Sequence, residues 1–272
     1  MGVINATPDS FSDGGTLYRR GRLDIELSLQ RARKMVGEGA HILDVGGEST
    51  RPGAEPVALQ QELDRVVPLI AAIVAELDVA VSVDTSSPEV MRESVAQGAT
   101  IINDVRALGR PGALQAAAET PATVCLMHMQ GAPDTMQQAP RYSDVVAEVA
   151  GFLQARADAC VAAGISGQRI WVDPGFGFGK SLEHNLELLQ GLPRLAELGY
   201  PLLVGLSRKS MIASLLGREL DERLPASLGL AVLAAERGAR IIRTHDVRAT
   251  ADAVAMAAAL AGLAENAVSE DR

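Results

Sequence analysis

Short apolar runs rich in β-branched residues recur along this chain of 272 residues, and each run ends in a cluster of polar residues. Stretches with helical spacing lie between the runs. Strands that alternate with helices indicate a parallel sheet, and polar residues at each strand end are typical of a (β/α)₈ barrel with its site at the C-terminal face. We therefore predict an α/β protein, a single (β/α)₈ barrel domain over residues 1–272. The predicted strands cover residues 2–5, 41–45, 80–84, 100–104, 123–128, 169–173, 202–205 and 240–243.

The stretches between the strands have the apolar spacing of amphipathic helices. Leu27, Ala32 and Met35, for instance, share one helical face. The polar end of the chain after residue 264 is expected to fray. Glycines that follow predicted helices, as C-terminal caps do, stand at positions 39, 98, 164, 199 and 238. The predicted helices cover residues 24–38, 56–76, 88–97, 112–119, 142–163, 183–198, 225–237 and 248–264.

Composition and charge argue against several classes of protein. The net charge of −9 argues against a nucleic-acid partner, because phosphate backbones attract basic surfaces. No apolar run approaches the roughly 20 residues of a membrane span, and no basic leader segment opens the sequence. Cys125 and Cys160 form no Cys-x-x-Cys motif and are expected to be small buried residues. We expect a cytoplasmic protein that acts on small molecules.

Three strand-end residues carry hydrogen-bonding groups that would meet at the mouth of the barrel. They are Asp84, Asn103 and Asp173. Carboxylates and a carboxamide suit a planar ring that presents several N–H donors and a carbonyl, such as a 2-amino-4-oxo heterocycle. A single strand-end Asp could equally be a helix cap. Three together favour a binding site.

The segment from Asp173 to Ser181, DPGFGFGKS, resembles a phosphate-binding loop only superficially. It is no Walker A motif, because Pro174 stands where glycine is required, and its glycine spacing does not fit a dinucleotide fingerprint. We interpret the Gly-Phe repeat as a flexible, flat-walled rim over a planar ligand. The alternative is a plain glycine-rich connection.

The last two predicted strands end in basic clusters, Ser207-Arg208-Lys209 and Arg243-Thr244-His245. Barrel enzymes often hold phosphate at this place, and Arg and Lys are suited to it. A local basic patch in an acidic protein therefore indicates a small anionic substrate. Solvated surface charges are one alternative, and a Schiff-base role for Lys209 is another.

Two polar loops and two further strand-end residues complete the candidate site. Residues 7–15 and 48–53 are expected to form mobile lids, with ordinary turns as the alternative. Asn5 could reach a Mg²⁺ ion that is carried by phosphates. His128 has no second His near it in sequence, so we expect it to form hydrogen bonds rather than to ligate a metal.

A set of motifs, one at each strand, carries a resemblance to a known family. They are MGVINATPDSFSDGG, DVGGESTRPGA, SVDT, INDV, CLMHMQG, DPGFGFGK, GLSRKS and R-x-HDV, in this order. Together they closely resemble bacterial dihydropteroate synthases, which are TIM barrels, over residues 1 to about 254. The resemblance implies a transferase of folate biosynthesis that joins 6-hydroxymethyl-7,8-dihydropterin diphosphate to p-aminobenzoate with Mg²⁺. It also implies an SN1-like reaction, inhibition by sulfonamides, and a homodimer formed by helices on the far side of the barrel.

The same resemblance assigns roles to individual residues. The catalytic residues it implies are Lys209, Asp84, Arg243 and His245. Those for the pterin are Asp84, Asn103, Asp173, Lys209, Met127, Gly205 and Phe178. Those for the diphosphate are Asn5, Arg243, His245, Thr50 and Arg51, with Asn5 also as metal ligand. Those for p-aminobenzoate are Thr50, Arg51, Pro52, Ser207, Phe178 and Lys209, and Phe11 and Asp13 belong to the first lid.

The chain departs from the family pattern in two places. The family usually has a short lead-in segment before the first strand, whereas the first strand predicted in this sequence starts at residue 2. Thr244 stands where an apolar residue is usual and is expected to point away from the ligand. The nearest alternative function is a pterin-binding barrel that presents methyltetrahydrofolate to a corrinoid protein, which needs neither Mg²⁺ nor the basic patch. A non-catalytic pterin-binding module and a Schiff-base aldolase are further alternatives.

Overall fold

The computed structural model describes residues 1–7, 17–19, 22–49, 57–131, 136 and 140–270. Eight parallel strands form one sheet in the order β1-β4-β5-β6-β7-β8-β9-β10. The main chain of Thr244 closes the sheet against β1, since the Val3 amide donates to the Thr244 carbonyl at 3.2 Å and the Thr244 amide donates to Met1. The fold is therefore a closed TIM barrel. Its strands are β1 (Gly2–Asn5), β4 (Ile42–Gly46), β5 (Ala80–Asp84), β6 (Ile101–Asp104), β7 (Thr123–Met127), β8 (Ile170–Asp173), β9 (Leu202–Val204) and β10 (Ala239–Ile242).

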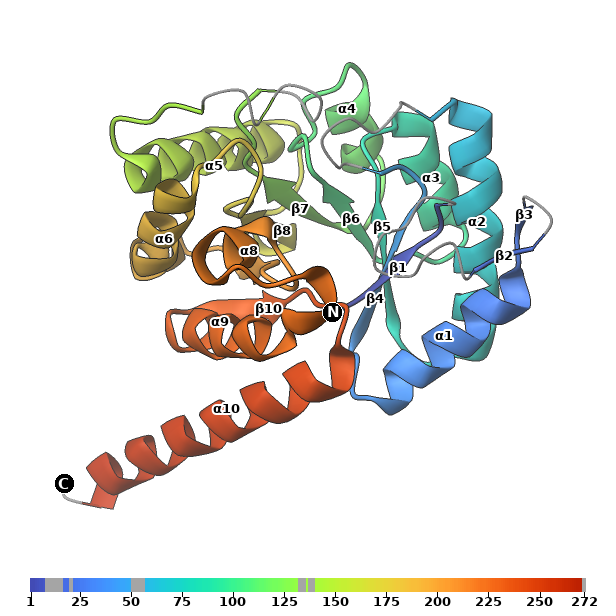
Figure 1. Cartoon of the computed structure of the whole chain (residues 1–272). Helices are drawn as coiled ribbons and strands as arrows, with labels where there is room; N and C mark the ends of the chain where they lie inside the picture. The colour runs from blue at the N-terminus through green and yellow to red at the C-terminus, as the bar shows by residue number, and fades with distance from the viewer. Residues whose placement is uncertain (8–16, 20–21, 50–56, 132–135, 137–139, 271–272) are drawn as a thin grey trace.

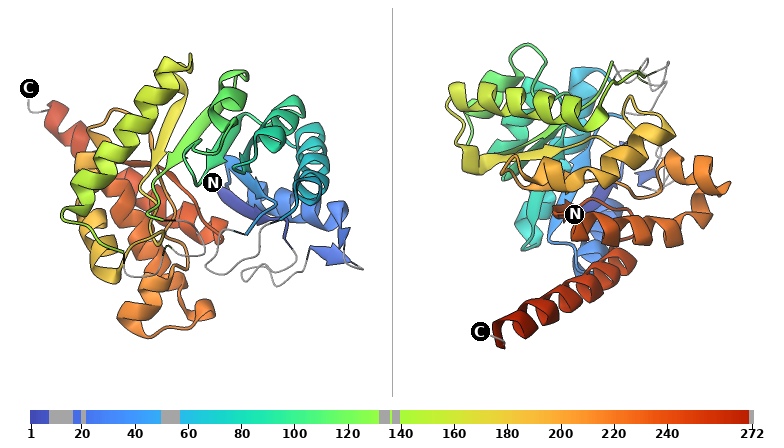
Figure 2. Two further views of the ribbon diagram at one scale, coloured as in Figure 1. Left: turned by 90° about the horizontal axis from the view of Figure 1, so that it is seen from above. Right: turned by 90° about the vertical axis from the view of Figure 1, so that its left-hand side faces the viewer.

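Helices surround the strands and cover the outer surface of the barrel (Figure 1). The last helix differs, because its C-terminal part extends beyond the barrel in all three views (Figures 1 and 2). No helix in the described part of the chain is long and apolar enough to cross a membrane. The helices are α1 (Ile25–Gly37), α2 (Leu59–Glu76), α3 (Pro88–Ala96), α4 (Ala113–Ala118), α5 (Val145–Ala162), α6 (Leu182–Gln190), α7 (Leu192–Ala196), α8 (Ser210–Leu216), α9 (Leu224–Glu236) and α10 (Val247–Glu270).

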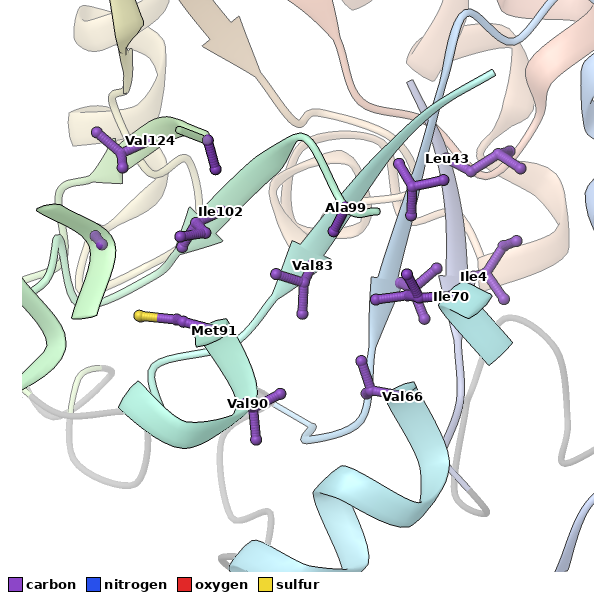
Figure 3. Close-up of a cluster of buried hydrophobic side chains, with 14 of the residues drawn as sticks. Ile4, Leu43, Val66, Ile70, Val83, Val90, Met91, Ala99, Ile102 and Val124 are labelled. Atoms are coloured by element: carbon purple, nitrogen blue, oxygen red, sulfur yellow. The ribbon is translucent and has the colours of Figure 1, made fainter. Parts of the chain in front are cut away.

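The alternation of side chains along each strand separates an apolar outer layer from the inward positions, which carry polar side chains toward the C-terminal ends of several strands. On β4, Leu43 and Val45 belong to a buried cluster that also contains Val66 and Ile70 of α2 (Figure 3). Asp44, between them, faces the opposite way and bonds to other strand-end side chains. A second cluster packs β8, β9 and β10 against α5, α6 and α7. The two large apolar clusters thus lie between strands and helices, and the polar inward positions gather at the C-terminal end of the barrel.

All eight predicted strands are present, and their boundaries agree to within one residue at each end. The predicted helix over 183–198 is instead two helices, α6 and α7. Pro193 lies in the first turn of α7, and α5 approaches so closely that a Cβ on Gly191 would lie 2.4 Å from Val146 Cγ2. Helix α10 also continues to Glu270, past the point where fraying was expected.

Several short elements were not predicted from the sequence. A short antiparallel hairpin, β2 (Tyr18–Arg19) with β3 (Arg22–Leu23), precedes α1. The short helix α8 follows Lys209, where the sequence analysis saw only a basic cluster. Two 3₁₀ turns, at Gly167–Arg169 and Leu220–Glu222, were also missed. These elements are too short to show a clear apolar period.

Candidate active site

The strand register brings the first polar residues of the site into one row. Asn5 of β1 pairs with Gly46 of β4, Gly46 pairs with Asp84 of β5, and Asp84 pairs with Asn103 of β6. A Cβ on Gly46 would lie 3.4 Å from the Cβ of Asp84, so glycine leaves this part of the row open. The row follows from strand pairing alone and sits at the C-terminal end of the barrel.

A buried ion network links this row to the last strand. The Arg243 guanidinium donates from Nε to Asp44 Oδ2 at 2.7 Å and from Nη2 to Asp84 Oδ2 at 2.9 Å. The Asn103 carboxamide donates to Asp44 Oδ2 at 3.2 Å. Asp44 is fully buried, whereas the Asp84 and Arg243 side chains are 16% and 24% exposed. The exposed atoms of the network therefore face the mouth of the barrel, and Asp44 forms its floor.

The network perturbs the ionisation of its members. Burial raises the pKa of Asp84, and the neighbouring Asp44 carboxylate raises it further, with Arg243 acting in the opposite direction. Burial alone would lower the pKa of Arg243, but Asp44 and Asp84 hold it above its ordinary value. Arg243 is thus a permanent cation between two carboxylates. The pKa of Asp84 is raised to about 7, so a small change in its surroundings can change its protonation state near neutral pH.

Asp173 ends β8 and starts the glycine-rich loop. Its Oδ1 accepts a hydrogen bond from the Gly175 amide at 2.7 Å, and burial raises its pKa while Lys209 and Arg243 lower it. Gly175 has a φ of +69°, and a Cβ there would lie 1.9 Å from the His128 carbonyl oxygen. Only glycine can occupy this position. The sharp turn directs the chain back over the barrel mouth.

The two phenylalanines of this loop have different positions. Phe178 is partly exposed, and the Lys209 Nζ lies 4.3 Å from the centre of its ring. Phe176 is 1% exposed and packs in the cluster around β8 and β9. The expectation of a flexible, flat-walled rim formed by the whole repeat is therefore wrong for Phe176, which is a core residue. Of these two phenylalanines, Phe178 provides an aromatic wall at the site.

Lys209 is half-buried among charged groups. Burial lowers its pKa to about 8, with Asp173 and Asp84 opposing the shift and Arg243 adding to it. The ammonium faces Asp173 and Phe178. A cation beside a carboxylate and an aromatic face is suited to hold a polar, planar ligand.

The two basic clusters together separate into residues that lie at the site and one, Arg208, that does not. His245 donates its backbone amide to Ser207 Oγ at 3.2 Å, and its Nδ1 lies 3.1 Å from the same oxygen. Arg208 instead forms a paired contact with Asp246, with Nε 2.8 Å from Oδ2. Its backbone has a φ of +58°, and its carbonyl accepts a bond from Arg223. Arg208 is therefore a structural link to α9 and not part of an anion patch.

The remaining predicted residues are distributed as follows. Met127 ends β7 and is 4% exposed, and a Cβ on Gly205 would lie 3.8 Å from Arg243 Cβ, so both border the network. The Thr244 hydroxyl bonds to the Asp246 amide and to Thr250, away from the site as expected. The predicted residues Phe11, Asp13, Thr50, Arg51 and Pro52 lie outside the described part of the chain.

Sequence reasoning missed two buried residues. Asp44 opens the polar motif DVGGESTRPGA and was given no role of its own, although its inward position could have been read from its two-residue spacing to Gly46. Lys180 ends the glycine-rich loop and is 3% exposed. His128 behaves as predicted, because its Nδ1 lies 3.0 Å from Lys180 Nζ and serves a hydrogen bond. Cys125 and Cys160 are both buried, as expected.

Within the described residues, no group of three or more His, Cys, Asp and Glu side chains could hold a metal ion by itself. Asn5 offers a hard carboxamide oxygen at the end of β1. Mg²⁺ commonly takes only one or two protein ligands when phosphates supply the others. The donor set at this end of the barrel fits a metal that arrives with a phosphorylated substrate.

Comparisons with known proteins give one consistent result. A family described as "Pterin binding enzyme" matches residues 1–245. The dihydropteroate synthase of Escherichia coli strain K12 is 53% identical over 266 residues, which are 98% of this chain and 93% of that protein. The Yersinia pestis dihydropteroate synthase, solved with a sulfonamide drug complex, has a TM-score of 0.92 at 49% identity, covering 96% and 93% of the two chains. The Burkholderia cenocepacia enzyme, solved with 7,8-dihydropteroate, has a TM-score of 0.87 at 45% identity, covering 97% and 92%.

Replacement of Asp44 by Asn should destabilise the protein by roughly 2–4 kcal/mol, because it leaves a buried guanidinium with one carboxylate in place of two. Urea unfolding of Asp44→Asn measures this cost. Glu119→Gln is the matched control, since the Arg92–Glu119 pair has side chains 42% and 45% exposed and should contribute less than about 1 kcal/mol. Equal effects of the two substitutions would contradict a structural role for the network.

His245 should remain neutral in the free protein well below pH 6. Burial lowers its pKa to about 3, and Arg243 and Arg208 contribute further. The unfolded chain takes up the proton near pH 6.5, so this side chain contributes stability above that pH which is lost as the pH falls toward 3. The His245 ring resonances, assigned by comparison with His245→Gln, should not titrate between pH 7 and 5. Titration near pH 6.5 would contradict this assignment.

Proposed function

The chain belongs to the pterin-binding enzyme family, and we propose that it acts as a dihydropteroate synthase. The reaction joins 6-hydroxymethyl-7,8-dihydropterin diphosphate to p-aminobenzoate and releases diphosphate. One observation carries the proposal: a carboxylate–carboxamide row meets two cations, Arg243 and Lys209, at one end of the barrel. This arrangement matches a substrate that has a polar ring at one end and an anion at the other.

The pterin ring is assigned to the pocket between Asp84, Asn103 and Asp173. Carboxylates accept paired N–H bonds from an aminopyrimidine edge, and the Asn103 carboxamide can both donate and accept. Lys209 would donate to the ring carbonyl, with Phe178 as an aromatic wall 4.3 Å from its ammonium. Met127 and Gly205 border the same space. The raised pKa of Asp84 and Asp173 fits groups that become hydrogen-bonded when the ring displaces water.

The diphosphate is assigned to Arg243, His245 and Asn5. Arg243 is a permanent cation at the mouth, and His245 presents its imidazole beside it. Asn5 would contribute one oxygen ligand to Mg²⁺, which neutralises charge on the departing diphosphate when it is bound. Thr50 and Arg51 are proposed to complete this subsite.

The p-aminobenzoate is assigned to the side of the pocket formed by Phe178, Ser207 and Lys209. Ser207 is held by His245, which joins this subsite to the diphosphate subsite. Thr50, Arg51 and Pro52 are proposed to form its outer wall, and Phe11 and Asp13 to belong to a lid. Relatives solved with 4-aminobenzoic acid and with a sulfonamide support this part of the proposal, as well as inhibition by sulfonamides.

The charge distribution favours a dissociative substitution. The bond between the methylene carbon and the diphosphate oxygen breaks first, and its electron pair leaves with the diphosphate. Arg243 and His245 stabilise the developing negative charge, while Asp84 and Asp173 stabilise the positive charge shared by the pterin ring. The aniline nitrogen then forms the new bond and loses a proton. The catalytic residues proposed are Lys209, Asp84, Arg243 and His245.

Release of diphosphate should require both the pterin diphosphate and p-aminobenzoate. Asp84→Asn and Asp173→Asn keep an acceptor oxygen but lose charge, and each should lower kcat/KM by an amount equivalent to about 2–4 kcal/mol. Arg92→Gln, on the outer surface, is the control. Wild-type kcat/KM in both Asp variants would refute the pterin pocket. Methyl transfer from methyltetrahydrofolate to a corrinoid, without diphosphate release, would favour the alternative function.

We also propose that the protein is a cytoplasmic homodimer. Leu233 of α9 and Met256 and Leu260 of α10 are large apolar side chains that are 38%, 67% and 66% exposed. They lie on two helices that pack against each other, and a second copy of this chain would cover them. The free, buried cysteines fit a reducing compartment.

Sedimentation equilibrium should give twice the mass of the chain, and the double substitution Met256→Glu with Leu260→Glu should reduce the measured mass to that of a monomer. A monomeric wild type would refute the dimer.

A further inference from the structure

Lys180, the last residue of the glycine-rich loop, has no role in the function proposed above. Its side chain is 3% exposed, and its Nζ lies 3.0 Å from His128 Nδ1, 2.9 Å from the Gly175 carbonyl oxygen and 3.1 Å from the Phe178 carbonyl oxygen. An ammonium has three N–H donors and no acceptor. The three neighbours therefore use its full hydrogen-bonding capacity, and the amine faces no open space.

These contacts fold the loop around one buried point. Gly175 and Phe178 are three residues apart, and the Phe178 amide also donates to the Gly175 carbonyl at 3.1 Å. The Lys180 ammonium thus donates to the carbonyl groups of both the first and the last residue of this turn, Gly175 and Phe178. His128 lies at the end of the neighbouring strand, β7, so the same ammonium fastens the turn to the barrel wall.

Other side chains hold the same segment at separate points. Asn185 Oδ1 accepts from the Gly177 amide at 2.8 Å, and the Tyr142 hydroxyl donates to the Gly179 carbonyl at 2.8 Å. A glycine-rich segment without such bonds would lose much entropy on ordering. The number of bonds indicates a loop that is fixed before any ligand binds.

The fixed loop determines where Phe178 and Lys209 lie. The Phe178 ring lies under the Lys209 ammonium, and a Cβ on Gly177 would lie 3.3 Å from Lys209 Cδ. The loop backbone therefore forms one wall of the channel occupied by the Lys209 side chain. A shift of the turn would move the aromatic wall and release Lys209 from its position.

We propose that Lys180 is a positioning residue, which locks the turn at residues 175–178 so that Phe178 and Lys209 are prearranged for the two substrates. Its effect on catalysis rests on the proposed function, whereas its effect on the loop does not. A nucleophilic role does not fit the geometry, because all three donors are engaged and the side chain is buried. Burial lowers the pKa of Lys180 to about 7, with Asp173 opposing the shift and Lys209 adding to it, so the ammonium that makes the three contacts is favoured below that pH.

The first test measures the loop without any substrate. Lys180→Met keeps an unbranched side chain that is one atom shorter and removes its donors. Hydrogen exchange followed by mass spectrometry should become at least roughly tenfold faster in a peptide that contains Gly177, Phe178 and Gly179, and remain unchanged in peptides of α2 and α3. This result does not depend on the reaction catalysed, so it separates failure of the clamp from failure of the proposed function.

The second test is a double-mutant cycle on kcat/KM. Lys180→Met alone should lower kcat/KM on the order of tenfold, about as much as loss of one charged hydrogen bond. In a Phe178→Ala background the same substitution should lower kcat/KM by clearly less, because the aromatic wall is already absent and only the positioning of Lys209 remains to be lost. Lys180 as a merely structural residue would give the same loss in both backgrounds, and that outcome would overturn the proposal.

The third test changes the partner of Lys180, so that the proposal can still be tested if Lys180→Met does not fold. His128→Asn can place a carboxamide oxygen near the position of Nδ1, whereas His128→Leu removes the acceptor. Faster loop exchange and lower kcat/KM in His128→Leu, with both near wild type in His128→Asn, would support the clamp. Equal behaviour of the two variants, or loop exchange unchanged in Lys180→Met, would overturn it.

Discussion

The site is organised around one guanidinium held between two carboxylates inside the barrel. Arg243 joins the end of β10 to Asp44 of β4 and Asp84 of β5, and Asn103 extends the network to β6. Removing such charges from water is costly unless geometry and hydrogen bonds compensate, so the strands must keep their register for the network to exist. The strand register therefore places the charged groups of the site, and the bonds between these groups in turn hold β4, β5, β6 and β10 in that register.

The apolar layer outside the strands stabilises the fold and offsets the free-energy cost of burying charged groups inside the barrel. Leu43, Val45 and Val83 pack against helices, and none of them contributes to the site. Stability thus comes from the outer layer, while alternate positions on the same strands carry Asp44 and Asp84 inward. The glycine-rich loop after β8 follows the same division, since Phe176 enters the core and Phe178 faces the mouth.

The sequence predicts the barrel well because each strand and helix has its own local signal. Strand ends also predict that Asp84, Asn103, Asp173, Lys209 and Arg243 meet, because all strands of a barrel present their C-terminal ends at one face. The sequence does not predict which of these side chains form ion pairs and hydrogen bonds with one another. Arg243 and Asp44 are 199 residues apart in sequence, and strand alternation predicts that Asp44 points inward but not which cation it meets. Arg208 and Phe176 were misassigned because neighbours in a motif can point in opposite directions. The small helix α8 was missed because seven residues give too few turns for a period.

The burial of both cysteines has a practical consequence. Cys125 lies on β7 and Cys160 on α5, and burial raises the pKa of both thiols, that of Cys160 to about 11. Thiolate, not thiol, is the reactive form, so neither residue should react readily with maleimides or mild oxidants while the protein is folded. The wild-type chain is consequently a natural background for single-cysteine labelling. A fluorophore or spin label on an introduced surface cysteine would report motion at the barrel mouth without removal of either native thiol.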